Sequence, residues 1–263
     1  MVTVRSTPLD APLFQIDPAR GVEYWGCRAV LAAFEIAGDV SALVPRGLHL
    51  GHPAVGAVLV ADYGASTLGP YREFVSLLAV SDQGGQAGFY VPYIYVTGDA
   101  ALAAGREVLG APKKLADVDV RAEPAAVLGT LARPSGQVLA SLSVAPLERL
   151  PAETLDALLP EGTPFFSLRH LPGPPGATQV SELVRWRCDL AVRQDAFGDH
   201  VRFSGPGSLA YPARSALDPV HHLEVGTLLA AAYLEFDMHL SAQGVVWSDT
   251  QLAGAAAGEE PSS

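Results

Sequence analysis

The apolar residues of this chain come in short runs, most of which end at glycine, proline or aspartate. The 263 residues include 26 glycines and 21 prolines, and these two residue types favour turns. Short apolar runs between turns are typical of β-strands, whereas helices need longer periodic segments. We therefore predict an α+β, β-rich fold: a single domain built on a closed or cone-like antiparallel β-barrel with a few short helices.

The expected elements follow from the residue types along each run. β-Branched and aromatic residues favour a strand at 88–96, and alanine favours a helix at 100–108. No linker or repeat divides the chain, so we expect one domain over residues 1–252 and a disordered tail over 253–263. Further strands are expected at 29–36, 54–61, 74–80, 128–131, 138–144, 165–171, 180–192 and within 223–240, with short helices at 40–44 and 152–159 and a turn at 66–70.

The charge and the cysteine content argue against several classes of protein. A formal net charge of −11 without a basic block disfavours binding to nucleic acid or to an anionic membrane. Cys27 and Cys188 are too few for a disulfide framework, so we expect a reducing compartment and buried, inert thiols. The N-terminus lacks the apolar run of a signal peptide, and no apolar run is long enough to span a membrane. These features predict a cytoplasmic location.

Lysine is rare in this chain. Lysine and arginine together number 17, but only Lys113 and Lys114 are lysines, and they are adjacent. Arginine stays charged, so it cannot supply the neutral amine that a nucleophile requires. The retained pair therefore points to an amine nucleophile, although compositional drift that leaves two surface lysines would give the same count. Pro112 stiffens the turn before the pair, and apolar neighbours such as Leu109 and Ala111 favour a neutral amine.

The residues around the two lysines resemble the motif of a known family. The run Gly-Arg-Glu-x-x-x-x-Pro-Lys-Lys-Leu at 105–115 is similar to the Schiff-base motif of the acetoacetate decarboxylase family. Gly-Pro-Tyr-Arg-Glu at 69–73 falls near the upstream spacing of that family. The resemblance covers nearly the whole chain, with weaker matches at 6–9, Phe14, 44–45, 129–131, 182–183, 205–206 and 224–240.

The resemblance implies roles for four residues of these motifs. It makes Lys113 the Schiff-base lysine and Glu73 the pocket carboxylate that handles protons or holds the substrate, while Tyr71 shapes the pocket. It makes Lys114 the adjacent cation that lowers the pKa of Lys113. Successive residues of an extended chain point to opposite faces, however, so Lys114 can instead face a carboxylate elsewhere while burial favours the neutral amine of Lys113.

Four further residues lie at or near positions of the family pattern. Arg106 and Glu107 are expected to pair with each other and to support the turn rather than to contact substrate. The family has a second pocket glutamate on the strand before the Tyr-x-Glu turn, where this chain has Val58. It also has a substrate-binding arginine on its first strand, close to Arg28, although a one-residue slip would turn that side chain to the wrong face.

Three functions are compatible with these residues. The first is a carbon–carbon lyase that decarboxylates a β-keto acid through an imine on Lys113. The second is an aldolase-dehydratase on a pyruvate-like oxo acid in a biosynthetic pathway, which the apolar residue at Val58 favours. The third is a non-catalytic protein that binds a small molecule. We predict a small oxo acid or ketone as substrate and, by analogy with the family, a homo-oligomer. Because the chain lacks G-x-G-x-x-G and Walker motifs, and has neither H-E-x-x-H nor a cysteine pair, we predict no metal or organic cofactor.

Overall fold

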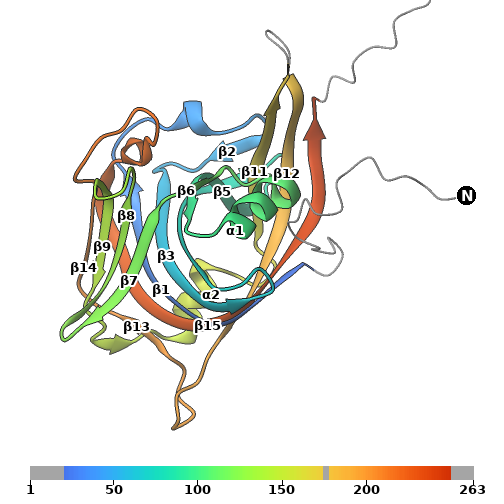
Figure 1. The fold of residues 1–263 in the computed structure, drawn as a ribbon. Helices are drawn as coiled ribbons and strands as arrows, with labels where there is room; N and C mark the ends of the chain where they lie inside the picture. The colour runs from blue at the N-terminus through green and yellow to red at the C-terminus, as the bar shows by residue number, and fades with distance from the viewer. Residues whose placement is uncertain (1–20, 174–177, 250–263) are drawn as a thin grey trace, which may run out of the picture.

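The longest strands form a closed ring (Figure 1). The computed structural model describes residues 21–173 and 178–249. Neighbouring strands of the ring are antiparallel, except that β5 and β11 are parallel. The ring closes because β15 pairs with both β12 and β1. In order, its strands are β1 (Val22–Ile36), β3 (Val55–Ser66), β4 (Tyr71–Asp82), β5 (Ala87–Val96), β11 (Pro164–Pro172), β12 (Thr178–Val192) and β15 (Val225–Ser248).

A second sheet packs against the outside of the ring at β1 and β3, on the left of Figure 1. Gly129 in this sheet permits the close approach, since a Cβ there would lie 2.7 Å from the Cβ of Val60 and 2.8 Å from the Cγ2 of Val30. The two layers bury a cluster of apolar side chains between them. The second sheet contains, in order, β14 (Gly207–Ala210), β9 (Val138–Val144), β8 (Ala126–Ala132) and β7 (Asp117–Glu123).

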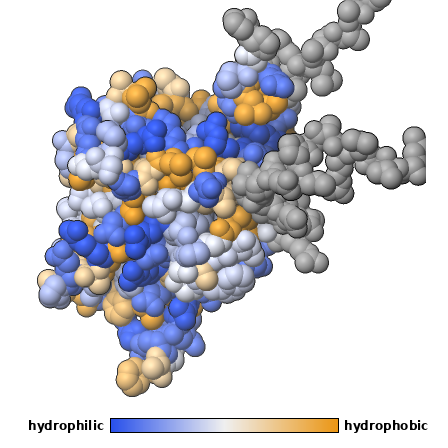
Figure 2. Space-filling view, viewed as in Figure 1, coloured by the Kyte–Doolittle hydropathy of each residue, from blue (hydrophilic) through white to orange (hydrophobic). Residues whose placement is uncertain are grey.

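The strand β1 is therefore covered on both faces. Alternation turns Leu31 and Ala33 into the ring, whereas Val30 and Ala32 face the second sheet. A strand covered on both sides needs apolar residues at almost every position, which explains the unbroken apolar run at 29–34. The outer face seen in Figure 2 differs from this pattern, because hydrophilic residues surround small groups of hydrophobic ones there.

Short elements occupy the ends of the ring. The helix α1 (Asp99–Ala104) continues into a π-helical turn, η2 (Gly105–Leu109), and then into β6 (Lys113–Leu115), which is parallel to β5. The helix α2 (Ala152–Leu158) contributes apolar side chains to the space inside the ring. In residues 21–173 and 178–249, no helix has the length and apolar character that a membrane crossing requires. The remaining elements are β2 (Leu48–Leu50), β10 (Glu148–Arg149), β13 (Arg202–Ser204) and the 3-10 turns η1 (Ser41–Leu43) and η3 (Val220–His222).

The predicted fold class is confirmed, and the structure corrects several details. The barrel is not wholly antiparallel, because β5 and β11 run parallel. The helix expected at 100–108 is α-helical only to Ala104 and π-helical beyond it. The strand expected within 223–240 begins at Val225 and continues to Ser248. The family-like residues at 6–9 and Phe14, and the tail expected at 253–263, lie outside the described residues.

Candidate active site

A sharp turn carries the two lysines from the helical segment into the barrel wall. The π-helical turn ends at Gly110, whose φ of +66° lies in the left-handed region that favours glycine. A Cβ at Gly110 would also lie 2.7 Å from the Cβ of Arg169. On the other side of the turn, the hydroxyl of Ser167 donates to the carbonyl of Leu109. The chain then runs through Pro112 into β6, so the position of Lys113 is fixed by its backbone.

The lysine at the start of β6 is buried beside the ring strand β5. Its side chain is 4 % exposed, and its Cα pairs in register with that of Ile94. The hydrocarbon part of the side chain lies directly over Gly105. A Cβ on that glycine would lie 2.4 Å from the Cδ of Lys113 and 2.5 Å from its Cε. Gly105 therefore provides the space that the lysine side chain occupies.

We expect the Gly105→Ala substitution to lower kcat/KM by about 100-fold, because displacing a reacting group by about 1 Å has a cost of that order. The backbone at Gly105 has φ −62° and ψ −45°, which alanine adopts readily. The loss of activity would therefore come from the collision of the new Cβ with Lys113 and not from backbone strain. Steady-state kinetics and a thermal melt measure the two consequences. The matched control is Gly51→Ala, where the new Cβ would lie 3.7 Å from the nearest atom, the carbonyl oxygen of Pro53. Wild-type kinetics in Gly105→Ala would show that the lysine side chain has room to move.

A carboxylate receives the ammonium group of Lys113 inside the barrel. Lys113 Nζ donates to Glu73 Oε2 at 2.7 Å, and the hydroxyl of Tyr63 donates to Glu73 Oε1 at 3.1 Å. The side chain of Glu73 is only 9 % exposed. Burial of a single charge would be costly, whereas an ion pair with both carboxylate oxygens hydrogen-bonded is tolerated. The arrangement holds a proton between an amine and a carboxylate, away from bulk water.

Three tyrosines pack around this pair. The hydroxyls of Tyr24 and Tyr71 lie 3.0 Å apart, and the ring of Tyr63 lies 4.8 Å from that of Tyr24 and 4.9 Å from that of Tyr71. Burial, with a contribution from the negative charge of Glu73, raises the pKa of all three phenols. They therefore stay protonated at neutral pH. Tyr71 was expected to shape the pocket. Its ring centroid lies 5.5 Å from Lys113 Nζ, while Tyr63 is the tyrosine that lines the cavity described below.

A cavity of about 370 Å³ lies inside the ring, and Glu73 forms part of its wall. Lys113 reaches this wall through its contact with Glu73. It also borders a separate space of about 10 Å³, which has room for roughly one water molecule. Leu240 lines both spaces. The cavity wall is almost entirely apolar and includes Leu31, Ala57, Leu59, Val75, Leu77, Phe165, Trp186, Leu234, Phe236 and Met238.

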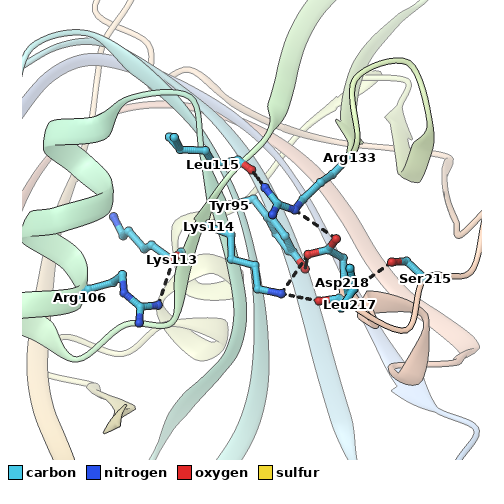
Figure 3. A network of polar contacts seen from close by, with 9 residues as sticks. All are labelled: Tyr95, Arg106, Lys113, Lys114, Leu115, Arg133, Ser215, Leu217 and Asp218. Carbon is cyan, nitrogen blue, oxygen red and sulfur yellow. Dashed lines mark hydrogen bonds and ion pairs between the residues drawn. The ribbon is translucent and has the colours of Figure 1, made fainter. Parts of the chain in front are cut away.

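The neighbouring lysine points away from this site (Figure 3). Lys114 Nζ lies 3.0 Å from Asp218 Oδ1 and also donates to the carbonyl of Leu217. The buried carboxylate of Asp218 accepts two more hydrogen bonds, from Arg133 Nε at 3.1 Å and from the hydroxyl of Tyr95 at 3.3 Å. The two lysines leave opposite sides of β6, as alternation along a strand requires. Of the two expectations for Lys114, the structure has the one in which it faces a distant carboxylate.

We therefore expect Lys114→Met to change kcat/KM by less than about 10-fold. The side chain of Lys114 is 41 % exposed, so water screens its charge, and Arg133 still pairs with Asp218 when Lys114 is absent. The thermal midpoint should fall only slightly. Steady-state kinetics of the wild type and the variant measure kcat/KM, and the rate of Lys113 modification across a pH series is compared in parallel. A fall in kcat/KM of more than 100-fold would mean that the charge of Lys114 acts on Lys113 across the strand.

Arg106 and Glu107 are exposed, on the outer side of the lysine turn. Arg106 Nη1 lies 3.4 Å from the backbone carbonyl of Lys113, and the carbonyl of Glu107 accepts a hydrogen bond from Arg169 Nη1 at 2.8 Å. The expected pairing of Arg106 with Glu107 is wrong for this structure, because each contacts another part of the chain instead. Both contacts hold the turn in place, and neither residue lines the cavity.

Two residues expected at the substrate site lie on the opposite face of their strands. The side chain of Arg28 donates to Asp62 at 2.8 and 3.2 Å and is 42 % exposed. Val58 is fully buried, but it packs in the apolar layer between the two sheets. Alternation explains both corrections, because the side chains of β1 and β3 that line the cavity come from odd-numbered residues, such as Leu31 and Ala57. The resemblance located these positions only to within a residue or two, and one residue changes the face.

Sequence analysis did not assign roles to several residues that surround the lysine. Gly105 was within the motif, but nothing local shows that a side chain lies over it. Tyr63 pairs in register with Tyr71, and only the pairing of β3 with β4 reveals that it contacts Glu73. Asp218 is 104 positions from Lys114, so no local pattern predicts their contact. Cys27 is buried as expected, whereas Cys188 is only partly buried and lines the cavity; burial raises the pKa of each thiol to about 12.

Comparison with known proteins identifies relatives over almost the full length. The sequence model of the family described as acetoacetate decarboxylase (ADC) matches residues 6–249. An acetoacetate decarboxylase of Streptomyces nogalater is 30 % identical over 250 residues, which cover 94 % of this chain and 96 % of that protein. The crystal structure of acetoacetate decarboxylase from Legionella pneumophila has a TM-score of 0.78 at 23 % identity and covers 94 % of this chain and 99 % of that one. The enduracididine biosynthesis enzyme MppR complexed with pyruvate shares the fold, with a TM-score of 0.64 at 15 % identity over 84 % of this chain and 88 % of that one.

Proposed function

Because this chain belongs to the acetoacetate decarboxylase family, we propose that it is a carboxy-lyase that removes CO₂ from a β-keto acid through an imine on Lys113. The observation that carries the proposal is the buried pair of Lys113 and Glu73, 2.7 Å apart at the wall of an apolar cavity. Imine chemistry needs an amine that can lose its proton and a group nearby that can accept it. The pair supplies both.

The reaction begins when Glu73 accepts a proton from Lys113. The free amine attacks the ketone carbon, Glu73 returns the proton to the carbinolamine hydroxyl, which leaves as water, and a protonated imine forms. Electrons of the bond between the α-carbon and the carboxylate then move into the imine, so CO₂ leaves and an enamine remains. Glu73 takes up a proton from solvent and delivers it to the α-carbon, and water hydrolyses the resulting protonated imine to release the ketone and Lys113. Because Glu73 rather than Lys113 borders the cavity, the carboxylate must turn aside for the amine to reach the substrate.

The direct test is borohydride reduction of the protein incubated with acetoacetate or with pyruvate, followed by intact-mass measurement and peptide mapping. The expected result is a stable adduct on Lys113 with acetoacetate, together with release of CO₂ from unreduced samples. A trapped adduct on a different residue would contradict the assignment. Failure of a folded sample to form an adduct with either acid would favour a non-catalytic binding function instead.

One observation favours a second function. Among the described residues that line the cavity, Glu73 is the only carboxylate, and the fold is shared by an enzyme whose structure was solved with pyruvate. The same imine on Lys113 can support condensation of a pyruvate-like acid with an aldehyde and loss of water. The products decide between the two: CO₂ from a β-keto acid supports the lyase, and a condensation product without CO₂ supports the aldolase-dehydratase. A cytoplasmic location and a homo-oligomeric state stay predictions of the sequence.

A further inference from the structure

The cavity is much longer than a four-carbon acid requires. Along β4 it is lined by Glu73, Val75, Leu77 and Ala79, which alternate with residues that face outward. Six residues of strand from Glu73 to Ala79 correspond to about 20 Å. The Lys113–Glu73 pair lies at one end of this length. The volume of about 370 Å³ is within the range of sites that hold ligands of drug size.

The far part of the cavity is apolar on every side. The helix α2 and the residue after it close it with Leu155, Leu158 and Leu159. The ring of Phe89 lies against that of Phe165, with centroids 5.6 Å apart, and Phe165 stacks on Trp186 at 4.6 Å. Among the described lining residues no lysine or arginine is present. The indole N–H of Trp186 is not available to a ligand, because it donates to the hydroxyl of Ser167. A second anionic or strongly polar group of a substrate would have no partner there.

We propose that the natural substrate is a β-keto acid with an extended apolar substituent on the ketone carbon, and that this substituent occupies the cavity from Glu73 towards Ala79 and α2. The inference rests on the proposed imine chemistry of Lys113 and adds the class of substrate. The carboxylate and ketone stay at the end that holds the ion pair, where charge is accommodated. The apolar chain fills the part of the cavity that acetoacetate leaves empty, and burial of this chain favours binding of the longer acid.

The experiment measures CO₂ release by the full-length protein from acetoacetate and from its straight-chain homologues up to about ten carbons, with the spontaneous rate subtracted. Each added methylene should raise kcat/KM about three- to four-fold until the cavity is full. Borohydride trapping on Lys113 is run in parallel with each acid. Trapping with all acids but a kcat/KM that is flat or falls with length would overturn the substrate class and leave the imine function intact. No CO₂ and no adduct from any acid would overturn the imine function, and with it this inference.

A variant at the far end tests the location of the chain. Ala79→Leu fills part of the cavity about 20 Å along β4 from Glu73. It should reduce the ratio of kcat/KM for the ten-carbon acid to that for acetoacetate by at least about 10-fold. The matched control is Ala87→Leu, which adds the same atoms at an exposed position outside the cavity and should keep the wild-type ratio. An unchanged ratio in a folded Ala79→Leu variant would place the chain elsewhere and overturn the proposal. The length series on the wild type stands even if this variant does not fold.

Discussion

Replacing Lys113 by methionine is expected to eliminate the borohydride adduct and to lower kcat/KM for CO₂ release by at least about 10,000-fold. Methionine keeps an apolar stem over Gly105 but has no amine, so no imine can form. The remaining groups at the site, a carboxylate and protonated tyrosines, cannot serve as an electron sink for the leaving CO₂. Intact-mass analysis after reduction and steady-state kinetics on the same sample measure both effects. Residual turnover near the wild-type level would refute the imine mechanism.

The same substitution has a second effect that must be separated from the first. Glu73 is buried, and removal of Lys113 leaves its charge without the partner at 2.7 Å. Breaking a buried pair on one side costs about 3–5 kcal/mol, so Lys113→Met should unfold at a lower temperature. The double substitution Lys113→Met with Glu73→Gln removes both charges and should recover much of that stability while staying inactive. Lys114→Met is the matched control, because it removes the adjacent amine and leaves the buried pair unchanged.

The outcome for the lysine pair shows what the sequence could predict about this site. The motif at 105–115 and the Tyr-x-Glu turn indicated Lys113 and Glu73, and the structure places their charged atoms in contact. The two are 40 positions apart but lie on either side of the ring strand β5, because β4 and β6 both pair with it. Two motifs far apart in the sequence can therefore predict a contact when their strands pair with the same barrel strand.

The sequence was less informative wherever the face of a strand or a distant contact decided the outcome. Arg28 and Val58 were placed at the site, but each lies on the strand face that is turned away from the cavity. A resemblance at low identity does not fix register to the single residue that alternation demands. Asp218 could not be predicted as the partner of Lys114, since their contact depends on how a loop before β15 returns to the barrel. The strand at 29–36 was predicted, whereas the second sheet that covers one face of β1 was not.

Glu73→Gln is expected to lower kcat by about 100- to 10,000-fold, the usual contribution of general acid–base catalysis, with a much smaller change in KM. Glutamine has nearly the same shape and can still accept a hydrogen bond from Lys113 or Tyr63, but it cannot take up a proton. Among the residues that the structure describes, no neighbour of Glu73 replaces it as the base. The pKa values of the phenols of Tyr24, Tyr63 and Tyr71 are raised by burial, and so is the pKa of the thiol of Cys188, to about 12, so these groups hold their protons near neutral pH.

The separation of imine formation from turnover identifies the role of Glu73. Glu73→Gln leaves the Lys113 amine in place, so the adduct should still form in this variant under borohydride. The later steps need a proton delivered to the α-carbon, and those should be slow. Glu73→Asp keeps the carboxylate one methylene further away and should recover part of kcat but not all of it. A Glu73→Gln variant with wild-type kcat would assign the proton transfers to water, whereas one with no adduct at all would mean that the carboxylate is needed to bind or orient the ketone.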